Sequence, residues 1–484
     1  MPTKMDWGKL LSTKRLGAED AAARKRPVRS EFESDVDRLV FSTAFRRLAG
    51  KTQVHPLASN DHIHSRLTHS IEVSRVGNTL GKLVAERMLS LPNAESQFPH
   101  AVKPDHFGSI VQAACIAHDF GNPPFGHAGE AEISHWFSDN EISAPLKNGS
   151  RATISNALSP EELFDIKIYE GNAQGFRFVS QIENNIFSGG FRLTYATLGS
   201  FHKYPWSSKH RSDKVGFYLS ELDVIDNIFS DIGLFKKSEN VWSRHPLAHL
   251  VEAADDICYS VIDLEDAVEL KIISFDEVFE ILEKIIPDED MRARLVDNRM
   301  HRVNFSLSRG RIVETSINAV CDCYMSNYEK IMMGDMDDGL ISNLDDGHPV
   351  KVGIGKAKEL AKEKVFSDNK KMELEIGSYA VYDILLRNFC GASLSRALEL
   401  QGTGSGVSVG WFRSRILNLL GDHAPRHDNP PPTGWCAYNC LRRSRGFYWR
   451  YDRQLCHLSC QSNERRGFFR RTSPLNATAS SRMP

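Results

Sequence analysis

Apolar residues recur every three or four positions along much of this chain, and this spacing collects them on one face of an α-helix. Between residues 31 and 54 the pattern predicts an N-terminal helix that leads into a turn, with apolar positions at Val36, Leu39, Val40 and Phe45. Residues 271–390 follow mostly helical spacing as well. An acidic stretch at 334–347 interrupts them, and it lacks the closing glutamate of a calcium loop, so we expect a solvated connection there. The pattern as a whole indicates an all-α protein.

The apolar run Val111–Ala117 leads directly into His118 and Asp119. Glycine and two prolines follow, and these residues break any helix that carried the pair. At a broken helix end, an imidazole nitrogen and a carboxylate oxygen can converge on one metal ion. A helix that restarts after the prolines would place His127 and Glu130 on one face, as a second functional pair.

The simpler interpretation is that one His-Asp dipeptide, in a chain with 18 histidines, belongs to the surface or caps a helix. Two other stretches favour a metal site. RLTHS supplies His69 on a helical pattern, and EAADDICYSVIDLEDA supplies Asp255 far downstream. Asp256 is the neighbouring alternative, and spacing alone does not choose between the two aspartates.

Asp255, Tyr259 and Asp263 fall at positions i, i+4 and i+8 of one predicted helix, so they form a single stripe. Ionised carboxylates are costly to bury unless they are paired or bound to a metal. We therefore expect this stripe to be solvated or to line a polar site rather than to face a core.

Composition sets limits on the class of protein. With 484 residues and 41% apolar content, the chain can bury a large core. Its net charge of −2 creates no basic field for nucleic acid, no apolar run reaches the length of a membrane span, and the N-terminus lacks a signal-peptide core. Nine scattered cysteines suggest reduced thiols and a cytoplasmic location. The chain has no G-x-x-x-x-G-K-[ST] loop, which argues against a P-loop enzyme.

The order H…HD…D with these flanking sequences resembles the HD-domain phosphohydrolases, and more closely the bacterial deoxyguanosine triphosphate triphosphohydrolases (dGTPases). The resemblance covers roughly residues 30–390, with a patch near 415–425. It implies a helical HD-domain fold around one divalent metal ion, Mn or Mg first, with Fe or Zn also compatible. The metal ligands it implies are His69, His118, Asp119 and Asp255, so the family pattern favours Asp255 over Asp256.

The resemblance also implies substrate contacts. These are Gln53 in KTQV, Arg66, Asn172 and Gln174 in GNAQG, Lys203 and Tyr204 in HKYPW, Tyr259 along the sugar and Asp263 at the 3′-hydroxyl. From the residues alone, the end of a solvated basic helix accounts equally well for Gln53 and Arg66. In the same way, a helix N-cap accounts for Asn172.

The expected reaction is hydrolysis of dGTP to deoxyguanosine and triphosphate. His127 is the expected general acid for the leaving 5′ oxygen, and Glu130 orients it. The alternatives are an HD phosphohydrolase with broader specificity for deoxynucleoside triphosphates or phosphomonoesters, and a catalytically dead nucleotide- or DNA-binding protein. The expected partners are dGTP or another deoxynucleoside triphosphate, with single-stranded DNA as a second candidate. No membrane is expected, and a homo-oligomer is expected if the C-terminus is intact.

The tail changes character after Pro425. Residues 430–484 are rich in arginine, lack lysine and carry two C-x3-C pairs, at Cys436, Cys440, Cys456 and Cys460. Taken at face value, this composition indicates a zinc module or an arginine-rich nucleic-acid arm. However, codons for residues 447 onward, read one nucleotide later, can encode FIGGMTDNYATYLA, which resembles the GMTD-x-YA signature at the end of dGTPases. We infer a frameshift that begins between Pro425 and Phe447.

An out-of-frame tail has no selected hydrophobic pattern, so we expect the residues after about Pro430 to pack poorly and to bind no zinc. The predicted division of the chain follows from these observations. It comprises an N-terminal arm at 1–30, a catalytic HD core at 31–275, a helical C-terminal part at 276–425 and an out-of-frame tail at 426–484.

Overall fold

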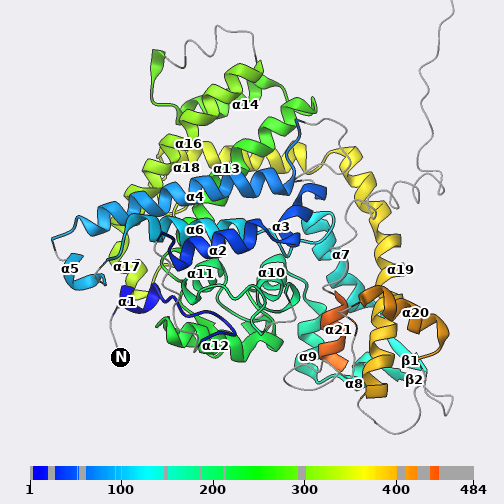
Figure 1. Cartoon of the computed structure of the whole chain (residues 1–484). Helices are drawn as coiled ribbons and strands as arrows, with labels where there is room; N and C mark the ends of the chain where they lie inside the picture. The colour runs from blue at the N-terminus through cyan, green and yellow to red at the C-terminus, as the bar shows by residue number, and fades with distance from the viewer. Residues whose placement is uncertain are drawn as a thin grey trace, which may run out of the picture.

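The structure is a computed structural model that describes most of the chain. The described residues are 4–19, 28–51, 53, 62–92, 94–99, 101–145, 151–184, 188–210, 214–290, 292, 301–400, 409–421, 424 and 437–445. Helices dominate them, as the hydrophobic pattern predicts, so the expected all-α class is confirmed (Figure 1). No helix in these ranges is long and apolar enough to cross a membrane.

The helices of the first half are α1 (Trp7–Leu10), α2 (Glu31–Val40), α3 (Thr43–Arg47), α4 (Arg66–Leu89), α5 (Ala94–Gln97), α6 (Pro104–Ala117), α7 (Gly126–Asp139), α8 (Ile154–Ala157), α9 (Pro160–Lys167), α10 (Gly171–Arg177), α11 (Tyr195–Phe201) and α12 (Leu222–Asp231). The later helices are α13 (Ala248–Glu269), α14 (Phe275–Leu282), α16 (His301–Ser326), α17 (Tyr328–Met333), α18 (Pro349–Leu360), α19 (Asn369–Leu400), α20 (Trp411–Leu420) and α21 (Ala437–Arg445).

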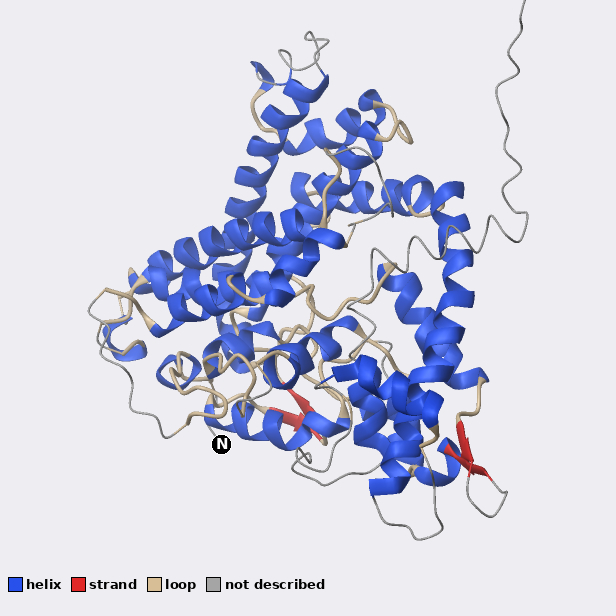
Figure 2. Ribbon diagram, turned by 45° about the vertical axis from the view of Figure 1, so that its right-hand side comes forward, coloured by secondary structure: helices blue, strands red, loops and turns tan. Residues whose placement is uncertain are grey.

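Short turns and strands complete the described elements. The 3-10 helices are η1 (Leu48–Gly50), η3 (Ser208–His210), η4 (Leu219–Glu221) and η5 (Glu283–Ile285), and the π-helices are η2 (Phe178–Ile182) and η6 (Ala361–Val365). Two small antiparallel pairs join β1 (Ser143–Pro145) to β2 (Arg151–Thr153) and β3 (Lys236–Ser238) to β4 (Val241–Trp242). Figure 2 shows them as two small red hairpins beside the helices.

The predicted helix at residues 31–54 is present but divided. Ser30 caps α2 by accepting a hydrogen bond from Glu33 N, and Ser42 starts α3 by accepting one from Phe45 N. The second serine cap explains the break, because its side chain competes for backbone donors. The acidic stretch at 334–347 forms a non-helical connection between α17 and α18 with exposed aspartates, as predicted.

The main core forms where α4 packs against α6, with α13 and α16 on its flank (Figure 1). Small residues permit this close approach. A Cβ at Gly81 would lie 2.8 Å from the carbonyl oxygen of Phe107, and one at Gly77 would lie 2.6 Å from Cys115 Sγ. The close packing positions the start of α4 beside the end of α6, and this is where the predicted metal ligands lie.

A second apolar cluster joins α7, α8 and α9 to the C-terminal helices α19, α20 and α21. Figure 1 shows the long α19 running from the α18 side of the molecule to this cluster. The cluster therefore connects the region after the HD motif with the last described part of the chain.

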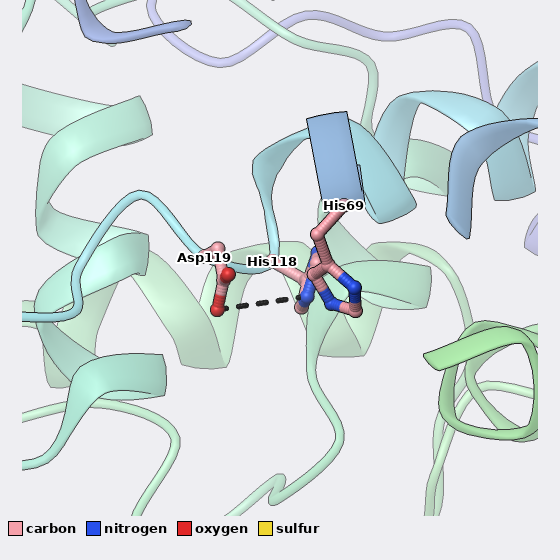
Figure 3. A group of neighbouring side chains, drawn as sticks. All are labelled: His69, His118 and Asp119. Atoms are coloured by element: carbon pink, nitrogen blue, oxygen red, sulfur yellow. Dashed lines mark ion pairs between the residues drawn. The ribbon is translucent and has the colours of Figure 1, made fainter. Parts of the chain in front are cut away.

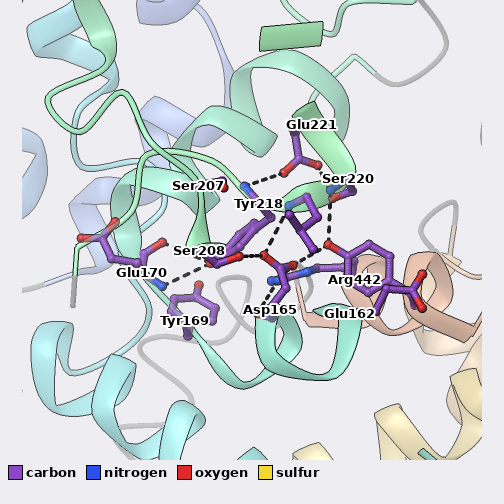
Figure 4. A network of polar contacts seen from close by, with 12 residues as sticks. Glu162, Asp165, Tyr169, Glu170, Ser207, Ser208, Tyr218, Ser220, Glu221 and Arg442 are labelled. Atoms are coloured by element: carbon purple, nitrogen blue, oxygen red, sulfur yellow. Dashed lines mark hydrogen bonds and ion pairs between the residues drawn. The ribbon is translucent and has the colours of Figure 1, made fainter. Parts of the chain in front are cut away.

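The expectation of poor packing after about Pro430 is wrong for residues 437–445. This segment forms α21, in which Tyr438, Leu441 and Arg442 are buried. Figure 4 shows Arg442 beside Asp165. The reason is an amphipathic pattern in residues 437–445, whose apolar face packs on α9 and α19. The segment 446–484, including Cys456 and Cys460, lies outside the described residues, as does Cys436. Cys440 is buried and forms no disulfide.

Candidate active site

Two histidines and an aspartate meet where α4 and α6 approach each other. His69 is buried on α4, and α6 ends immediately before His118 and Asp119, as the glycine and prolines after them predict. Ligand atoms of the three side chains all lie within 4.8 Å of one another (Figure 3). A group of this kind, built from distant segments of the chain, could hold a metal ion.

Asp255 of α13 faces the same point. Its Oδ1 lies 3.1 Å from His69 Nε2 and 3.5 Å from His118 Nε2. The neighbouring Asp256 instead accepts a hydrogen bond from Lys358 Nζ at 2.8 Å, on the side toward α18. The helix therefore directs Asp255 to the histidines and Asp256 away from them.

The donor atoms suit a divalent cation. His118 Nδ1 lies 2.6 Å from the carbonyl oxygen of Cys115, so it donates its proton there and leaves Nε2 directed at the two carboxylates. His69 directs Nε2 at Asp255, while its Nδ1 has no hydrogen-bond partner among the described residues. Imidazole and carboxylate ligands together fit Mn, Fe, Mg or Zn.

Charge in the cluster is arranged for a cation. Burial alone would lower the pKa of His118, but the charges of Asp119 and Asp255 raise it to about 9. Burial alone would raise the pKa of Asp119, yet Arg66 and the two histidines lower it to about 2. These pKa shifts favour ionised carboxylates at the cluster, which is the form that binds a cation.

Arg66 and Asn122 hold the two oxygens of Asp119. Arg66 Nη1 donates to Oδ2 at 2.8 Å, and Asn122 Nδ2 donates to Oδ1 at 2.5 Å. Gly126 makes room for this arrangement, because a Cβ there would lie 2.9 Å from Arg66 Nη2 and its φ is +55°. The Arg66 guanidinium thus lies against the cluster and also faces the open space above it.

A cavity of about 510 Å³ opens over the cluster, a size typical of small-molecule sites. Most residues that the sequence assigned to the substrate line it, namely Gln53, Arg66, Asn172, Lys203, Tyr204 and Tyr259. His127 lines it too, whereas Gln174, Glu130 and Asp263 are not among its lining residues.

His127 and Glu130 form the predicted pair on α7. His127 Nδ1 lies 2.9 Å from Glu130 Oε2, and its side chain is 83% exposed toward the cavity side, while Glu130 is buried. The other oxygen of Glu130 accepts a hydrogen bond from Gly171 N at 2.8 Å. Glu130 therefore both orients His127 and ties α7 to the start of α10.

Lys203 lies on the cavity wall beside Tyr204, whose ring centroid is 5.5 Å from the ammonium nitrogen. Glu252 Oε1 is 3.2 Å from Lys203 Nζ, and its Oε2 accepts from Arg244 Nη1 at 2.7 Å. Burial alone would lower the pKa of Lys203, but Glu252 raises it above its ordinary value. Lys203 is therefore a fixed positive charge at the cavity.

Two expectations need correction. Glu170, not Asn172, is the N-cap of α10: its carboxylate accepts from Asn172 N at 2.6 Å, so the capping interpretation of Asn172 is wrong. Asp263 neither is solvated nor lines the cavity. Eight residues beyond Asp255, about 12 Å along the helix, it is buried, and its carboxylate lies beside the Tyr259 hydroxyl. Burial and Asp266 raise its pKa well above the ordinary value.

The sequence interpretation missed several lining residues. They are Asn122, Phe125, Lys214, Glu252, Phe366, Lys371 and Glu375. Asn122 lies inside the HD motif and Glu252 one turn before Asp255, so their positions could have identified both. Phe366 lies in the junction between η6 and α19, and Lys371 and Glu375 lie in α19; this stretch has no motif, and only the tertiary fold brings these residues to the cavity.

No protein-family model matches the chain. It is similar to a deoxyguanosinetriphosphate triphosphohydrolase-like protein of Pseudomonas aeruginosa, with 41% identity over 429 residues, which are 87% of this chain and 91% of that protein. A protein of the same description from Synechocystis is 34% identical over 82% of this chain and 89% of its own length. The deoxyguanosinetriphosphate triphosphohydrolase of Salmonella enteritidis is 33% identical over 73% and 75%, respectively.

Proposed function

Because the chain belongs to the deoxyguanosinetriphosphate triphosphohydrolase family and is thus a hydrolase, we propose that it hydrolyses a deoxynucleoside triphosphate, dGTP first, to the deoxynucleoside and triphosphate. The observation that carries this proposal is the cluster of His69, His118 and Asp119, with Asp255, beneath a cavity lined by cationic and aromatic side chains. Imidazole and carboxylate ligands for a metal ion, with cationic side chains near them for phosphate oxygens, suit metal-dependent hydrolysis of a phosphate ester.

The ligands proposed for one divalent cation are His69, His118, Asp119 and Asp255. Manganese or magnesium is the first choice, and bound there it would neutralise charge on the α-phosphate and lower the pKa of an attacking water. Around that position, Arg66 and Asn122 fix the carboxylate of Asp119, and the Cys115 carbonyl fixes the tautomer of His118.

The protein's own side chains hold the substrate and supply the proton. Lys203, Arg66 and Asn172 offer donors to phosphate oxygens, and Tyr259 and Gln53 offer a wall to the sugar. His127 protonates the leaving 5′ oxygen, and Glu130 orients its ring through the contact with Nδ1. Gln174 and Asp263 remain candidates from the resemblance, the latter because its carboxylate lies beside Tyr259, which lines the cavity.

The decisive experiment identifies the bond that breaks. Purified protein is incubated with dGTP and Mn²⁺, and the products are separated by ion-exchange chromatography. We expect deoxyguanosine and tripolyphosphate. Formation of dGMP with pyrophosphate, or release of orthophosphate, would contradict the proposal.

The second candidate is a hydrolase of the same chemistry with broader specificity among deoxynucleoside triphosphates. Relatives described only as triphosphohydrolase-like make this worth testing. Parallel reactions with dATP, dCTP and dTTP separate the two candidates, because comparable kcat/KM values for all four substrates would favour the broader one. Single-stranded DNA and a second copy of the chain are further proposed partners, to be tested by titration and gel filtration.

A further inference from the structure

The buried guanidinium of Arg442 connects α21 to the body of the protein. Its Nη2 donates to the carboxylate of Asp165 and, at 2.5 Å, to the carbonyl oxygen of the same residue (Figure 4). The guanidinium also stacks on Tyr218, with its carbon 3.5 Å from the ring centroid. Arg442 and Tyr218 are both almost completely buried, so the stacking fixes the plane of the Tyr218 ring.

The hydroxyl of Tyr218 in turn holds the backbone of Glu170. It accepts a hydrogen bond from Glu170 N at 3.2 Å and donates one to Glu170 O at 3.3 Å. Two hydrogen bonds from one hydroxyl to a single residue fix that residue closely, because displacement in either direction breaks one of them. Figure 4 shows Tyr218 lying between Glu170 and Arg442.

Glu170 is the point where this support reaches the cavity. Its carboxylate accepts from the backbone and side-chain nitrogens of Asn172, at 2.6 and 2.9 Å, and from Lys214 Nζ at 3.3 Å. Asn172 and Lys214 both line the cavity, whereas Glu170 is buried behind them. The position of Glu170 therefore decides where an amide and an ammonium donor stand on the cavity wall.

The carboxylate of Glu170 lies close to a second buried carboxylate, that of Glu130. Glu130 approaches the same end of α10 and accepts from Gly171 N, so two buried carboxylates share one short helix start. Burial, and then the charge of Glu130, raise the pKa of Glu170. The backbone of Glu170 must therefore be held in place. A small displacement would break hydrogen bonds to its carboxylate and leave the repulsion from Glu130 uncompensated.

We propose that Tyr218, clamped by Arg442 of α21, is a positioning residue for substrate binding: it holds Glu170 so that Asn172 and Lys214 meet the triphosphate. The inference rests on the proposed function. It assigns the C-terminal helix a role in the site although no residue of α21 lines the described cavity.

The test compares Tyr218→Phe with Tyr328→Phe. Each change removes a buried hydroxyl that makes two hydrogen bonds, but those of Tyr328 join Trp7 and Gln97, away from the cavity. In Tyr218→Phe we expect KM for the triphosphate to rise about threefold to tenfold, with kcat within about twofold and metal content unchanged. Tyr328→Phe should keep both kinetic constants.

A second variant changes Arg442, the residue that stacks on the Tyr218 ring. Arg442→Lys keeps the charge but not the planar stacking, so it should raise KM as Tyr218→Phe does. Unchanged KM in both variants, or an equal rise in Tyr328→Phe, would overturn the inference and leave the proposed function standing. Titration with inorganic tripolyphosphate measures the same effect without turnover: weaker binding in Tyr218→Phe alone supports the inference. Absence of binding and turnover in the unmodified protein would reject both.

Discussion

Asp255 and Asp256 are neighbours on α13 with opposite surroundings, and this contrast makes them a matched pair for testing the metal site. Asp255 contacts His69 and His118, whereas Asp256 bonds Lys358. Asp255→Ala should therefore lose the metal and the activity together while circular dichroism stays helical, and Asp256→Ala should keep both. Elemental analysis of the purified variants checks this prediction. A full equivalent of metal in Asp255→Ala would remove that residue from the ligand set.

His127 offers a test of proton transfer that is separate from metal binding. Its ring lines the cavity and contacts Glu130, which is not one of the proposed metal ligands. His127→Ala should therefore retain metal and substrate while turnover falls by about 10² to 10⁴. Glu130→Ala should cost less in kcat because it orients the ring, but it also removes the partner of Gly171 N and should raise KM. Normal turnover in His127→Ala would show that His127 and Glu130 have a structural role and take no part in proton transfer.

The pH dependence of stability has a specific origin at His64, just before α4. Burial alone would lower its pKa, but hydrogen bonds and charge from Asp266 and Glu72 raise it to about 10. A raised histidine pKa stabilises the fold fully below the unfolded value of about 6.5, and this contribution is lost as pH rises toward 10. The destabilisation caused by His64→Gln should thus be largest near pH 6 and should shrink by pH 10. Urea unfolding at both pH values measures it, and an equal loss at both would contradict the assignment.

Among the helices, the contact of α4 with α6 allows a prediction about packing. A methyl group at Gly81 would meet the backbone of Phe107 and Gly108 within 3 Å, so Gly81→Ala must force the helices apart. We expect a loss of about 1–3 kcal/mol in the free energy of unfolding. Gly310→Ala in α16 is the matched control: nothing lies within 4 Å of its added Cβ, and alanine favours the helix there. Equal stability of the two variants would show that the helices adapt freely.

Local sequence signals predicted some helix ends and residue pairs, whereas contacts between distant segments could be identified only from the three-dimensional structure. The break after α6 followed from glycine and proline in the sequence, and the spacing of His127 and Glu130 followed from the helix period. The sequence could not decide between neighbouring candidates for the N-cap of α10. Whether Glu170 or Asn172 caps this helix depends on the backbone geometry of a single turn. Phe366 and Glu375 reach the cavity only through the packing of η6 on α13 and of α19 on α7, which no local pattern encodes.

At the scale of the whole molecule, the second apolar cluster bears on where the reading frame changes, because it includes residues of α21. The second cluster needs α21, whose Tyr438 and Arg442 both engage Asp165 on α9. Random codons are not expected to bring a buried hydroxyl and a buried guanidinium nitrogen to one carboxylate, although Arg442 Nε has no hydrogen-bond partner among the described residues. Because α21 packs within this arginine-rich tail, we expect the frame change to lie after α21, which narrows the interval that begins at Pro425.

We expect the reading frame to change between the codons of Arg443 and Phe447. The helix that contains Arg442 packs on α9 and α19, whereas codons for the residues from Phe447 onward can encode a string that resembles the GMTD signature in the next frame. Restoring the frame at Arg443 should therefore raise the melting temperature and the turnover, because it keeps α21 and adds the family's last segment. Restoring it at residue 426 is the control and should lower both, since it replaces Arg442 and its contacts. If the second version were the more stable protein, the packing of α21 would be fortuitous and the frame change would lie upstream.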